Sequence, residues 1–333
     1  MIMARTTVFM TDKTWPDLEI EKKIFEQSGL DIDFVLSKGG SPEDICREGS
    51  QCDILMVLFT PMGKQYLEMF DKCRALIRLG IGTNSVDMAV ATQKGIQVAN
   101  VPDYCQEEVA DHAFALFLEL TRKVGLLDAD VRKGRWEMSI ADPVPRLQTL
   151  TFALWGCGGI GRLTGHRARA FGMKLIGYDP FCPDAVFTEN GIERYTDLKS
   201  FLAAADVVSL HTPLTPETDK MVNAETLGWM KESAYLINSS RGPLIDEDAL
   251  YSVLANKKIA GAGLDVLTVE PPKGVHKLCE FANCIITPHA AWNSTEAIPE
   301  LRVKAAEEVV RFLSTGHVKH LVNKDVLGVA GRS

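Results

Sequence analysis

The 333-residue sequence lacks the features that would mark several classes of protein. No apolar run approaches the roughly 20 residues that a membrane-spanning helix needs. The first residues, MIMARTTVFMTDK, contain no apolar core of the signal-peptide type. Basic residues are fewer than acidic ones, 36 against 44, so the formal net charge is −8. This balance argues against nucleic acid or an anionic membrane as a partner.

The eight cysteines include no CxxC pair and are scattered through apolar or helical stretches. We interpret them as reduced thiols, which are typical of a cytoplasmic protein. Cys279, Cys284 and His289 are close along the chain, but their spacing fits no structural zinc site. The sequence therefore predicts a cytoplasmic protein without a bound metal ion.

The chain contains instead a glycine-rich turn between two apolar runs. The runs 151–155 and 173–178 are predicted strands, and 162–171 is a predicted helix. In the dinucleotide-binding fingerprint, the first glycine permits a tight turn, the second admits the pyrophosphate, and the third lets the helix pack on the strand. The helix N-terminus offers N–H groups to phosphate. The residues predicted to bind a dinucleotide here are Gly156, Gly158, Gly159, Ile160, Gly161 and Asp179.

Asp179 lies 18 positions after Gly161, at the end of the second predicted strand. Its carboxylate can accept hydrogen bonds from both hydroxyls of the adenosine ribose and would repel a 2′-phosphate. The next three residues, 180–182, supply no cation. These features favour NAD over NADP. The alternative is an ordinary strand–helix–strand turn that binds nothing.

Predicted strands and helices alternate along the chain, which indicates an α/β protein with parallel sheets. The length predicts two domains. We expect the predicted helix at 294–313 to pair with the first hundred residues. Within the central region, 130–136 is a predicted helix and 186–195 a predicted loop. We therefore predict two Rossmann-like domains: a discontinuous, flavodoxin-like substrate domain of residues 1–103 and 294–333, and a doubly wound NAD-binding domain of residues 104–293.

Several predicted strands after the glycine turn end in polar residues. Ligands of a doubly wound sheet lie beyond the carboxyl ends of its strands. The strand-end residues that we expect to converge near the coenzyme are His211, Arg241, Asp265 and His289. The neighbouring residues that we expect to contact it are Thr212, Pro213, Thr218, Asn238, Ser239 and Ser240. His112 lies in an apolar helical stretch, so we interpret it as a core or interface histidine.

Reduction of a 2-oxo acid by hydride transfer needs a cation for the carboxylate, a proton donor, and a group that keeps the donor protonated. Arg241 has a planar guanidinium suited to a carboxylate, and His289 titrates near neutrality. Glu270 can bind His289 and favour its charged form. Asp265 can accept a hydrogen bond from the nicotinamide carboxamide. Structural interpretations remain open: Arg241 as a cap or surface ion pair, Glu270 as a solvated acid, and His289 as a core histidine.

At these residues the chain resembles the D-isomer-specific 2-hydroxyacid dehydrogenases over nearly its whole length. Five motifs occur in order: GCGGIG followed by Asp179, HTPLTPET at 211–218, NSSRGPLIDEDAL at 238–250, GAGLDVLTVEPP at 261–272, and TPHAAW at 287–292. This resemblance implies the two-domain fold and the use of a nicotinamide coenzyme.

The family also implies roles for individual residues. Arg241, Glu270 and His289 match its catalytic trio. The backbone N–H groups of Ile81 and Gly82 are implied to bind the substrate carboxylate. A homodimer is implied as well, with the helix around residues 107–122 at its interface.

Three stretches, VPDYCQEEVADHAF, TPHAAWNSTEA and LVNKDVL, resemble the subgroup that contains the C-terminal binding proteins. Those proteins are transcriptional corepressors that keep the dehydrogenase fold and site. Trp292 matches a tryptophan that lines the substrate pocket there, and an apolar ring would favour an apolar substrate side chain. Glycerate-type enzymes also carry a tryptophan nearby.

We therefore predict an NAD-dependent oxidoreductase that interconverts a small 2-oxo acid and its D-2-hydroxy acid. The substrate is expected to be of the glyoxylate or hydroxypyruvate type or to have an apolar side chain. One alternative is a non-enzymatic, NAD(H)-responsive protein like the corepressors. A second is a phosphoglycerate-type dehydrogenase without a regulatory domain after residue 333, and a third is an enzyme that oxidises an inorganic or one-carbon acid.

Overall fold

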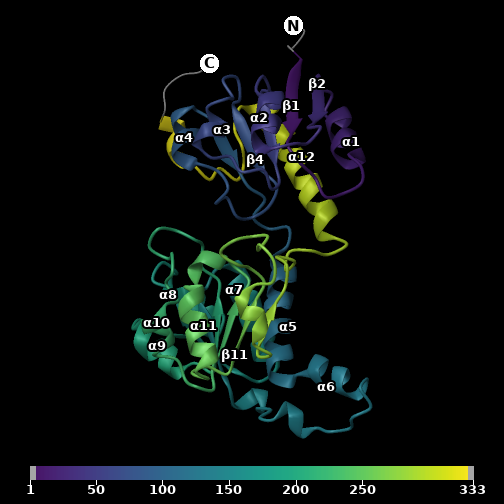
Figure 1. Ribbon diagram of the computed structural model, residues 1–333. Helices are drawn as coiled ribbons and strands as arrows, with labels where there is room; N and C mark the ends of the chain where they lie inside the picture. The colour runs from purple at the N-terminus through teal and green to yellow at the C-terminus, as the bar shows by residue number, and fades with distance from the viewer. Residues whose placement is uncertain (1–4, 329–333) are drawn as a thin grey trace. The chain divides into compact units, whose positions relative to one another are not determined.

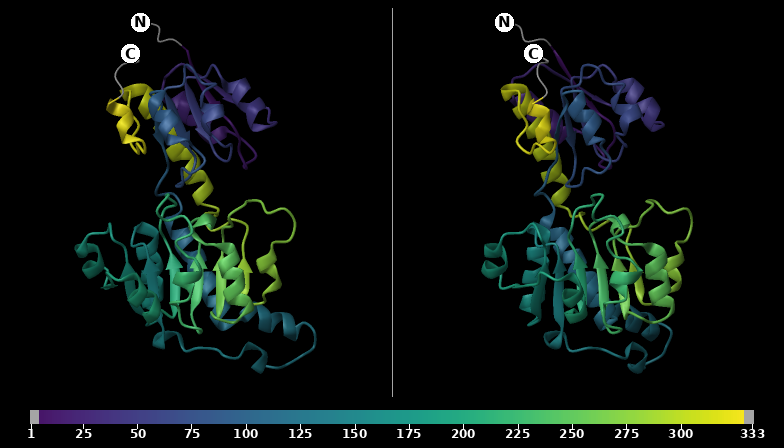
Figure 2. Two further views of the ribbon diagram at one scale, coloured as in Figure 1. Left: turned by 60° about the vertical axis from the view of Figure 1, so that its left-hand side comes forward. Right: turned by 90° about the vertical axis from the view of Figure 1, so that its left-hand side faces the viewer.

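The computed structural model describes residues 5–328, which form two compact units (Figure 1). Of the described residues, the first unit contains 5–105 and 294–328, and the second contains 106–293. Each unit is built on its own parallel sheet, with helices packed on both faces (Figure 2). The predicted α/β class with two parallel sheets is confirmed.

The sheet of the first unit has the strand order β2-β1-β3-β4-β5, which is the flavodoxin-like order. Phe9, Leu55 and Val57 point to one face and pack with α2, α3 and α4 in an apolar core. On the other face, α12 packs against α1 and β4, so the last long helix completes a unit begun by the first hundred residues. The strands are β1 Thr6–Met10, β2 Ile32–Leu36, β3 Ile54–Val57, β4 Ala75–Arg78 and β5 Gln97–Ala99; the helices are α1 Glu19–Gln27, α2 Pro42–Gly49, α3 Lys64–Leu67, α4 Met88–Gln93, α12 Ala297–Thr315 and the 3-10 turn η5 Lys324–Gly328.

The sheet of the second unit has the strand order β12-β11-β10-β9-β6-β7-β8. β6 is first in sequence but lies inside the sheet, so the strand order reverses between β6 and β9. In a doubly wound sheet this reversal marks the ligand-binding edge. The strands are β6 Thr151–Trp155, β7 Lys174–Tyr178, β8 Glu193–Arg194, β9 Val207–Leu210, β10 Tyr235–Asn238, β11 Gly261–Leu264 and β12 Cys284–Ile286. The helices are α5 Gln106–Arg122, α6 Val124–Val131, α7 Gly159–Ala170, α8 Asp184–Glu189, α9 Leu198–Ala204, α10 Ala224–Leu227 and α11 Glu247–Ala255, with 3-10 turns η1 Ser139–Ala141, η2 Leu147–Thr149, η3 Gly242–Leu244 and η4 Lys277–Glu280.

Alternate residues of β6 enter two different cores, because successive side chains of a strand point to opposite faces. Phe152 and Leu154 pack against the apolar side of α5. Ala153 and Trp155 pack on the other face, against α9 and α11. The sheet is therefore buried on both faces, and its carboxyl edge is left to carry the polar residues.

Two stretches differ from the sequence-based expectation. A helix was predicted at 130–136, but the helix in this region, α6, spans Val124–Val131. It begins directly after α5 because Lys123 takes the left-handed conformation, with φ 51°. The loop predicted at 186–195 overlaps α8 and the two-residue strand β8. α8 and β8 have six and two residues, which is too short to show a hydrophobic period.

No helix within residues 5–328 is long and apolar enough to cross a lipid bilayer.

Candidate active site

The glycine turn connects the end of β6 to the start of α7. Gly156 has φ +100°, and a Cβ there would lie 2.7 Å from the carbonyl of His211. A Cβ on Gly161 would lie 2.4 Å from the carbonyl oxygen of Gly156. A Cβ on Gly158, the N-cap of α7, would meet nothing within 4 Å. Two glycines are therefore required by the close packing of the chain itself, and the third leaves open space that fits a pyrophosphate.

Asp179 follows β7 and holds the glycine turn. Its Oδ2 accepts a hydrogen bond from the N–H of Cys157 at 2.9 Å. Its Oδ1 accepts from the N–H groups of Phe181 and Cys182, at 3.0 and 3.1 Å. These three bonds fix the carboxylate beside the turn, at the position where the adenosine ribose of a dinucleotide is expected.

Two arginines that the sequence motifs do not include also lie near this turn. Arg162 Nη1 donates to the carbonyl oxygen of Cys157 at 3.4 Å. Burial raises the pKa of the Cys157 thiol to about 12, and the charges of Arg162 and Arg194 oppose that rise. Arg194 forms an ion pair with Asp184. Neither arginine is among residues 180–182, so inspection of that segment alone could not find them.

His211 and the turn after β10 lie at the same edge of the sheet. His211 as a whole is half-buried, but its ring atom Nδ1 is buried. Burial lowers the pKa of His211 to about 3. Asn238 shapes the neighbouring turn: its Oδ1 accepts from Ser240 N–H at 3.0 Å, and its Nδ2 donates to the carbonyl of Arg241 at 2.8 Å. His211 Nδ1 and Ser239 Oγ have no hydrogen-bond partner within residues 5–328. Both atoms fit a site that completes its bonding with a coenzyme.

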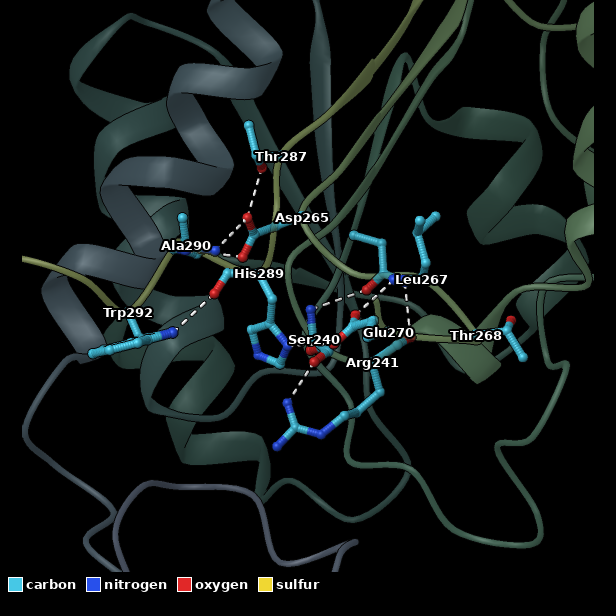
Figure 3. Close-up of polar contacts among 12 residues, drawn as sticks. Ser240, Arg241, Asp265, Leu267, Thr268, Glu270, Thr287, His289, Ala290 and Trp292 are labelled. Carbon is cyan, nitrogen blue, oxygen red and sulfur yellow. Dashed lines mark hydrogen bonds and ion pairs between the residues drawn. The ribbon is translucent and has the colours of Figure 1, made fainter. Parts of the chain in front are cut away.

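His289 and Glu270 form the central pair of the site (Figure 3). His289 Nδ1 lies 2.6 Å from Glu270 Oε2, and Glu270 Oε1 accepts from the N–H of Leu267 at 2.7 Å. Burial acts to raise the pKa of Glu270, but its bonds to His289 and Leu267 outweigh burial, and the pKa lies below the ordinary 4.5. Glu270 is therefore ionised at neutral pH and can only accept, so Nδ1 of His289 carries the proton. Nε2 remains as the ring nitrogen that can face a substrate.

Arg241 follows β10, directly before η3 Gly242–Leu244. Its positive charge contributes to the lowered pKa of Glu270, so the guanidinium lies close to that carboxylate. Figure 3 draws Arg241 in the same cluster of side chains as His289 and Glu270. The structure therefore brings together the three residues predicted as a trio, although they come from three different strand ends.

Asp265, at the end of β11, is buried, with 1% of its side chain exposed. Its Oδ1 accepts from Thr287 Oγ1 at 2.6 Å and from Ala290 N–H at 2.9 Å, and its Oδ2 accepts from Ala291 N–H at 2.9 Å (Figure 3). The carboxylate thus fixes the loop that carries His289. A bond to a nicotinamide carboxamide, as predicted, would use an oxygen that already accepts from the protein.

The other predicted residues lie in the loops at these strand ends. Thr218 Oγ1 donates to the carbonyl of Pro213 at 2.8 Å, which holds the loop after β9. Thr212 Oγ1 lies 3.7 Å from Met221 Sδ. Trp292 Nε1 donates to the carbonyl of His289 at 2.8 Å. Gly159 and Ile160 are the first two residues of α7.

Ile81 and Gly82 belong to the first unit, in the loop after β4. The carbonyl of Ile81 accepts a hydrogen bond from Asn100 Nδ2 at 2.7 Å. Among the described residues, no group of three or more His, Cys, Asp or Glu side chains is placed to hold a metal ion.

The family model of the NAD-binding domain of D-isomer specific 2-hydroxyacid dehydrogenases matches residues 114–291. A hydroxypyruvate reductase of Blautia hydrogenotrophica is 38% identical over 325 residues, which cover 94% of this chain and 96% of that protein. The chain belongs to the D-isomer-specific 2-hydroxyacid dehydrogenase family.

Two solved structures of similar proteins share the architecture of this dehydrogenase. An NADPH-dependent glyoxylate/hydroxypyruvate reductase from Sinorhizobium meliloti, in complex with NADP and malonate, has a TM-score of 0.83 at 27% identity and covers 96% of this chain and 97% of its own. D-lactate dehydrogenase from Aquifex aeolicus, with NAD and lactic acid, has a TM-score of 0.82 at 27% identity and covers 98% and 100%.

Membership of this family makes the dehydrogenase an oxidoreductase that interconverts 2-oxo and 2-hydroxy acids with a nicotinamide coenzyme. The predicted family, the two-domain fold and the reaction class are confirmed. These similarities do not favour a non-enzymatic, corepressor-like protein or a phosphoglycerate-type dehydrogenase.

Proposed function

We propose that this dehydrogenase uses NAD(H) to interconvert a small 2-oxo acid and its D-2-hydroxy acid. The substrate is of the glyoxylate or hydroxypyruvate type, or has an apolar side chain. The observation that carries the proposal is the 2.6 Å contact of His289 with Glu270, close to Arg241, at the sheet edge that bears the glycine turn. Coenzyme binding is assigned to residues 104–293, and residues 1–103 with 294–333 form the substrate domain.

The bound coenzyme supplies the hydride that reduces the carbonyl carbon. His289 donates a proton from Nε2 to the carbonyl oxygen and takes it back in the oxidation direction. Glu270 accepts from Nδ1–H, which fixes the ring and leaves Nε2 to face the substrate. His211 has a pKa of about 3 and is uncharged at neutral pH, so it is not the acid. The two histidines of the sheet edge therefore have different roles.

Arg241 binds the substrate carboxylate through the fork of its guanidinium and polarises the adjacent carbonyl. The backbone N–H groups of Ile81 and Gly82 are proposed as further donors to that carboxylate. Trp292, whose indole N–H is bonded to the carbonyl of His289, presents an apolar ring to the substrate side chain. These assignments explain why a short 2-oxo acid is the expected substrate.

The preference for NAD rests on Asp179, whose carboxylate is fixed by three N–H groups and would repel a 2′-phosphate. The nearby charge of Arg194 is paired with Asp184. We expect kcat/KM with NADH to exceed the value with NADPH by about tenfold or more, the equivalent of one lost or repelled contact. A clear preference for NADPH would show that Arg162 and Arg194 outweigh Asp179.

The substrate class is tested with a panel of 2-oxo acids, each assayed by the absorbance of NADH. Glyoxylate and hydroxypyruvate represent the small polar substrates, and 2-oxo acids with branched or aromatic side chains represent the apolar ones. We expect turnover with at least one of the two sets. If no 2-oxo acid oxidised NADH, the proposal would fail, and an inorganic or one-carbon acid would have to be tested instead.

We also propose that the dehydrogenase is a cytoplasmic homodimer whose interface includes α5 and the segment 124–144. α6 and the chain after it extend from the body of the second unit (Figures 1 and 2). The large apolar side chains exposed on this segment are Val124, Leu126, Val131, Trp136, Met138, Ile140 and Val144. Trp136 is 90% exposed and Met138 85%. An adjacent hollow along α5 is lined mainly by apolar side chains. Apolar surface of this extent is typical of a contact with another chain.

The dimer is tested with Trp136→Glu, which places a charge in the middle of this segment. We expect the wild-type protein to sediment as a dimer and the variant to dissociate at micromolar concentration, because an unpaired charge in an interface is costly. Val275→Glu is the matched control, since Val275 is also 90% exposed but lies in another loop. A monomeric wild-type protein would contradict the proposal.

A further inference from the structure

The loop that carries His289 is held in a conformation that its sequence does not favour. His289 has φ +52°, in the left-handed region that non-glycine residues rarely adopt, although asparagine, aspartate and histidine occur there more often than the others. Such a backbone costs about 1–3 kcal/mol and persists only where surrounding contacts impose it. The direction in which the imidazole points is therefore determined by whatever holds this loop.

Asp265 supplies the contacts that impose this conformation. Its backbone carbonyl accepts from the N–H of His289 at 2.8 Å. Its two carboxylate oxygens accept from the N–H groups of Ala290 and Ala291, each at 2.9 Å. Three successive N–H groups of the turn around His289 thus donate to the buried Asp265. The position of the Asp265 carboxylate therefore determines the position of the His289 imidazole.

A second layer of side chains holds Asp265 in turn. Thr287 Oγ1 donates to Asp265 Oδ1 at 2.6 Å. His112 Nε2, from the middle of α5, lies 2.9 Å from the same threonine oxygen and 3.4 Å from Asp265 Oδ1. Because an ionised carboxylate only accepts, the single hydroxyl proton of Thr287 goes to Asp265. The threonine oxygen must then accept, and Nε2 of His112 must be the donor.

We propose that His112 is a positioning residue for catalysis, which acts through Thr287 and Asp265 to fix the loop that carries His289. These hydrogen bonds connect α5 to the loop that carries the His289 imidazole. The first of them joins His112 to Thr287, which are 175 positions apart in the sequence. The side chain of His112 is 27% exposed, so it is not simply a filler of the apolar core. The inference rests on the proton-donor role proposed for His289.

The proposal is tested with paired variants that remove or keep a single hydrogen bond. His112→Leu removes the donor, whereas His112→Gln keeps an N–H at the place of Nε2. Thr287→Val removes the hydroxyl with little change of shape, and Thr287→Ser keeps it. His166→Leu is the matched control, because His166 is an exposed histidine of the same unit, whose Nε2 lies 3.0 Å from Asn190 Oδ1. Each variant is assayed for kcat, for KM, for the dissociation constant of NADH and for the midpoint of thermal unfolding.

We expect His112→Leu and Thr287→Val to lower kcat by about tenfold to a hundredfold, because a small misplacement of a catalytic group costs this much. KM and the dissociation constant of NADH should change by less than about threefold, which identifies a loss in the chemical step. His112→Gln and Thr287→Ser should recover most of the rate. The double variant His112→Leu with Thr287→Val should be no slower than the slower single variant, since both break one chain of bonds.

Two results would overturn the inference. One is a kcat for His112→Leu and Thr287→Val equal to that of His166→Leu. The other is a loss of kcat that follows the loss of thermal stability and is the same for His112→Gln as for His112→Leu, which would show a structural role only. His289→Gln is assayed alongside: if it stayed active, the proposed role of His289 would fail, whereas an inactive His289→Gln with normal His112 variants would reject this inference alone.

Discussion

At the scale of single residues, two histidines at one sheet edge differ because their surroundings differ. The ring nitrogen Nδ1 of His211 is buried, and burial lowers the pKa of His211 to about 3. The side chain of His289 is 43% exposed and bonded to an ionised carboxylate, that of Glu270. A pair of titratable groups in contrasting environments is the usual way in which a site separates its acid from its structural residues. The environment, and not the residue type, is the reason why we propose His289 rather than His211 as the acid.

The burial of His211 predicts a dependence of stability on pH. The unfolded chain takes up a proton at His211 below about pH 6.5, whereas the folded chain does so only near pH 3. The folded pKa is depressed, so the folded protein loses stability as the pH falls through this window. In His211→Gln this loss is absent.

We expect the difference in unfolding free energy between about pH 7 and pH 4 to be smaller in the His211→Gln variant than in the wild type. Denaturant unfolding at both pH values measures it. An equal difference in the two proteins would show that the imidazole is solvated and titrates normally.

The convergence of Arg241, Glu270 and His289 could be predicted from the sequence, but the residues that support them could not. Arg241 and His289 each follow an apolar run that predicts a strand. Residues that follow parallel strands lie at the same edge of the sheet, so the two could be expected to lie close together. The contact of His112 with Thr287 joins positions 175 apart, and no sequence motif contains both residues. Arg162 and Arg194 were missed for a similar reason, since the packing of α7 and β8 on β7 brings both charges near Cys157. Contacts of this kind depend on the packed structure rather than on local pattern.

At the scale of elements, the glycine turn separates two physical demands. A Cβ on Gly161 would lie 2.4 Å from the backbone oxygen of Gly156, which cannot move aside without disturbing β6. A Cβ on Gly158 would meet no protein atom within 4 Å. Gly161 is therefore needed to fold the turn, whereas Gly158 is needed only when a ligand approaches it.

We expect Gly161→Ala to destabilise the protein by about 1–3 kcal/mol, as overpacking does. Gly158→Ala should leave the unfolding free energy within about 0.5 kcal/mol of the wild type but weaken NADH binding at least about tenfold, because its methyl group occupies the space for the pyrophosphate. Denaturant unfolding and NADH fluorescence titration measure the two effects. Equal NADH affinity in Gly158→Ala would place the pyrophosphate elsewhere.

The elements that could be predicted are those with a clear period or a clear boundary. β6 and β7 are apolar runs that end at a glycine and at an aspartate, and they were predicted nearly to the residue. α8 has six residues and one buried aromatic, Phe187, and β8 has two polar residues at the sheet edge. β8 forms by pairing with β7, and α8 packs against β8. Contacts of this kind cannot be read from the pattern of a single sequence.

At the scale of the whole molecule, the first unit is assembled from two distant parts of the chain. Arg302 on α12 is buried and donates to Glu21 on α1, at 2.8 and 2.7 Å, across 281 positions of sequence. The side chain of Glu21 is 0% exposed. Arg302 Nη2 also donates to Asp17 at 3.0 Å. This ion pair fixes α12 against the part of the chain that contains the first strand.

Breaking this buried pair should destabilise the first unit strongly. We expect Glu21→Gln to lower the unfolding free energy of that unit by about 3–5 kcal/mol, since it leaves the buried guanidinium with only the half-exposed Asp17 as a charge partner. The double variant Glu21→Leu with Arg302→Met should lose clearly less, because no charge remains buried. Denaturant unfolding followed by the fluorescence of Trp15, whose ring lies under Arg302, reports on this unit. A loss under about 1 kcal/mol in Glu21→Gln would indicate that water reaches the pair.

In the proposed mechanism, His289 transfers the proton, and the other residues of the site bind and orient the substrate. The most direct measurement is kcat for His289→Gln with a 2-oxo acid that the wild type reduces, together with the dissociation constant of NADH in the same preparation. We expect NADH to bind within about twofold of the wild-type value and kcat to fall by about 10² to 10⁴. A variant that binds NADH normally and turns over at the wild-type rate would contradict the proposed mechanism.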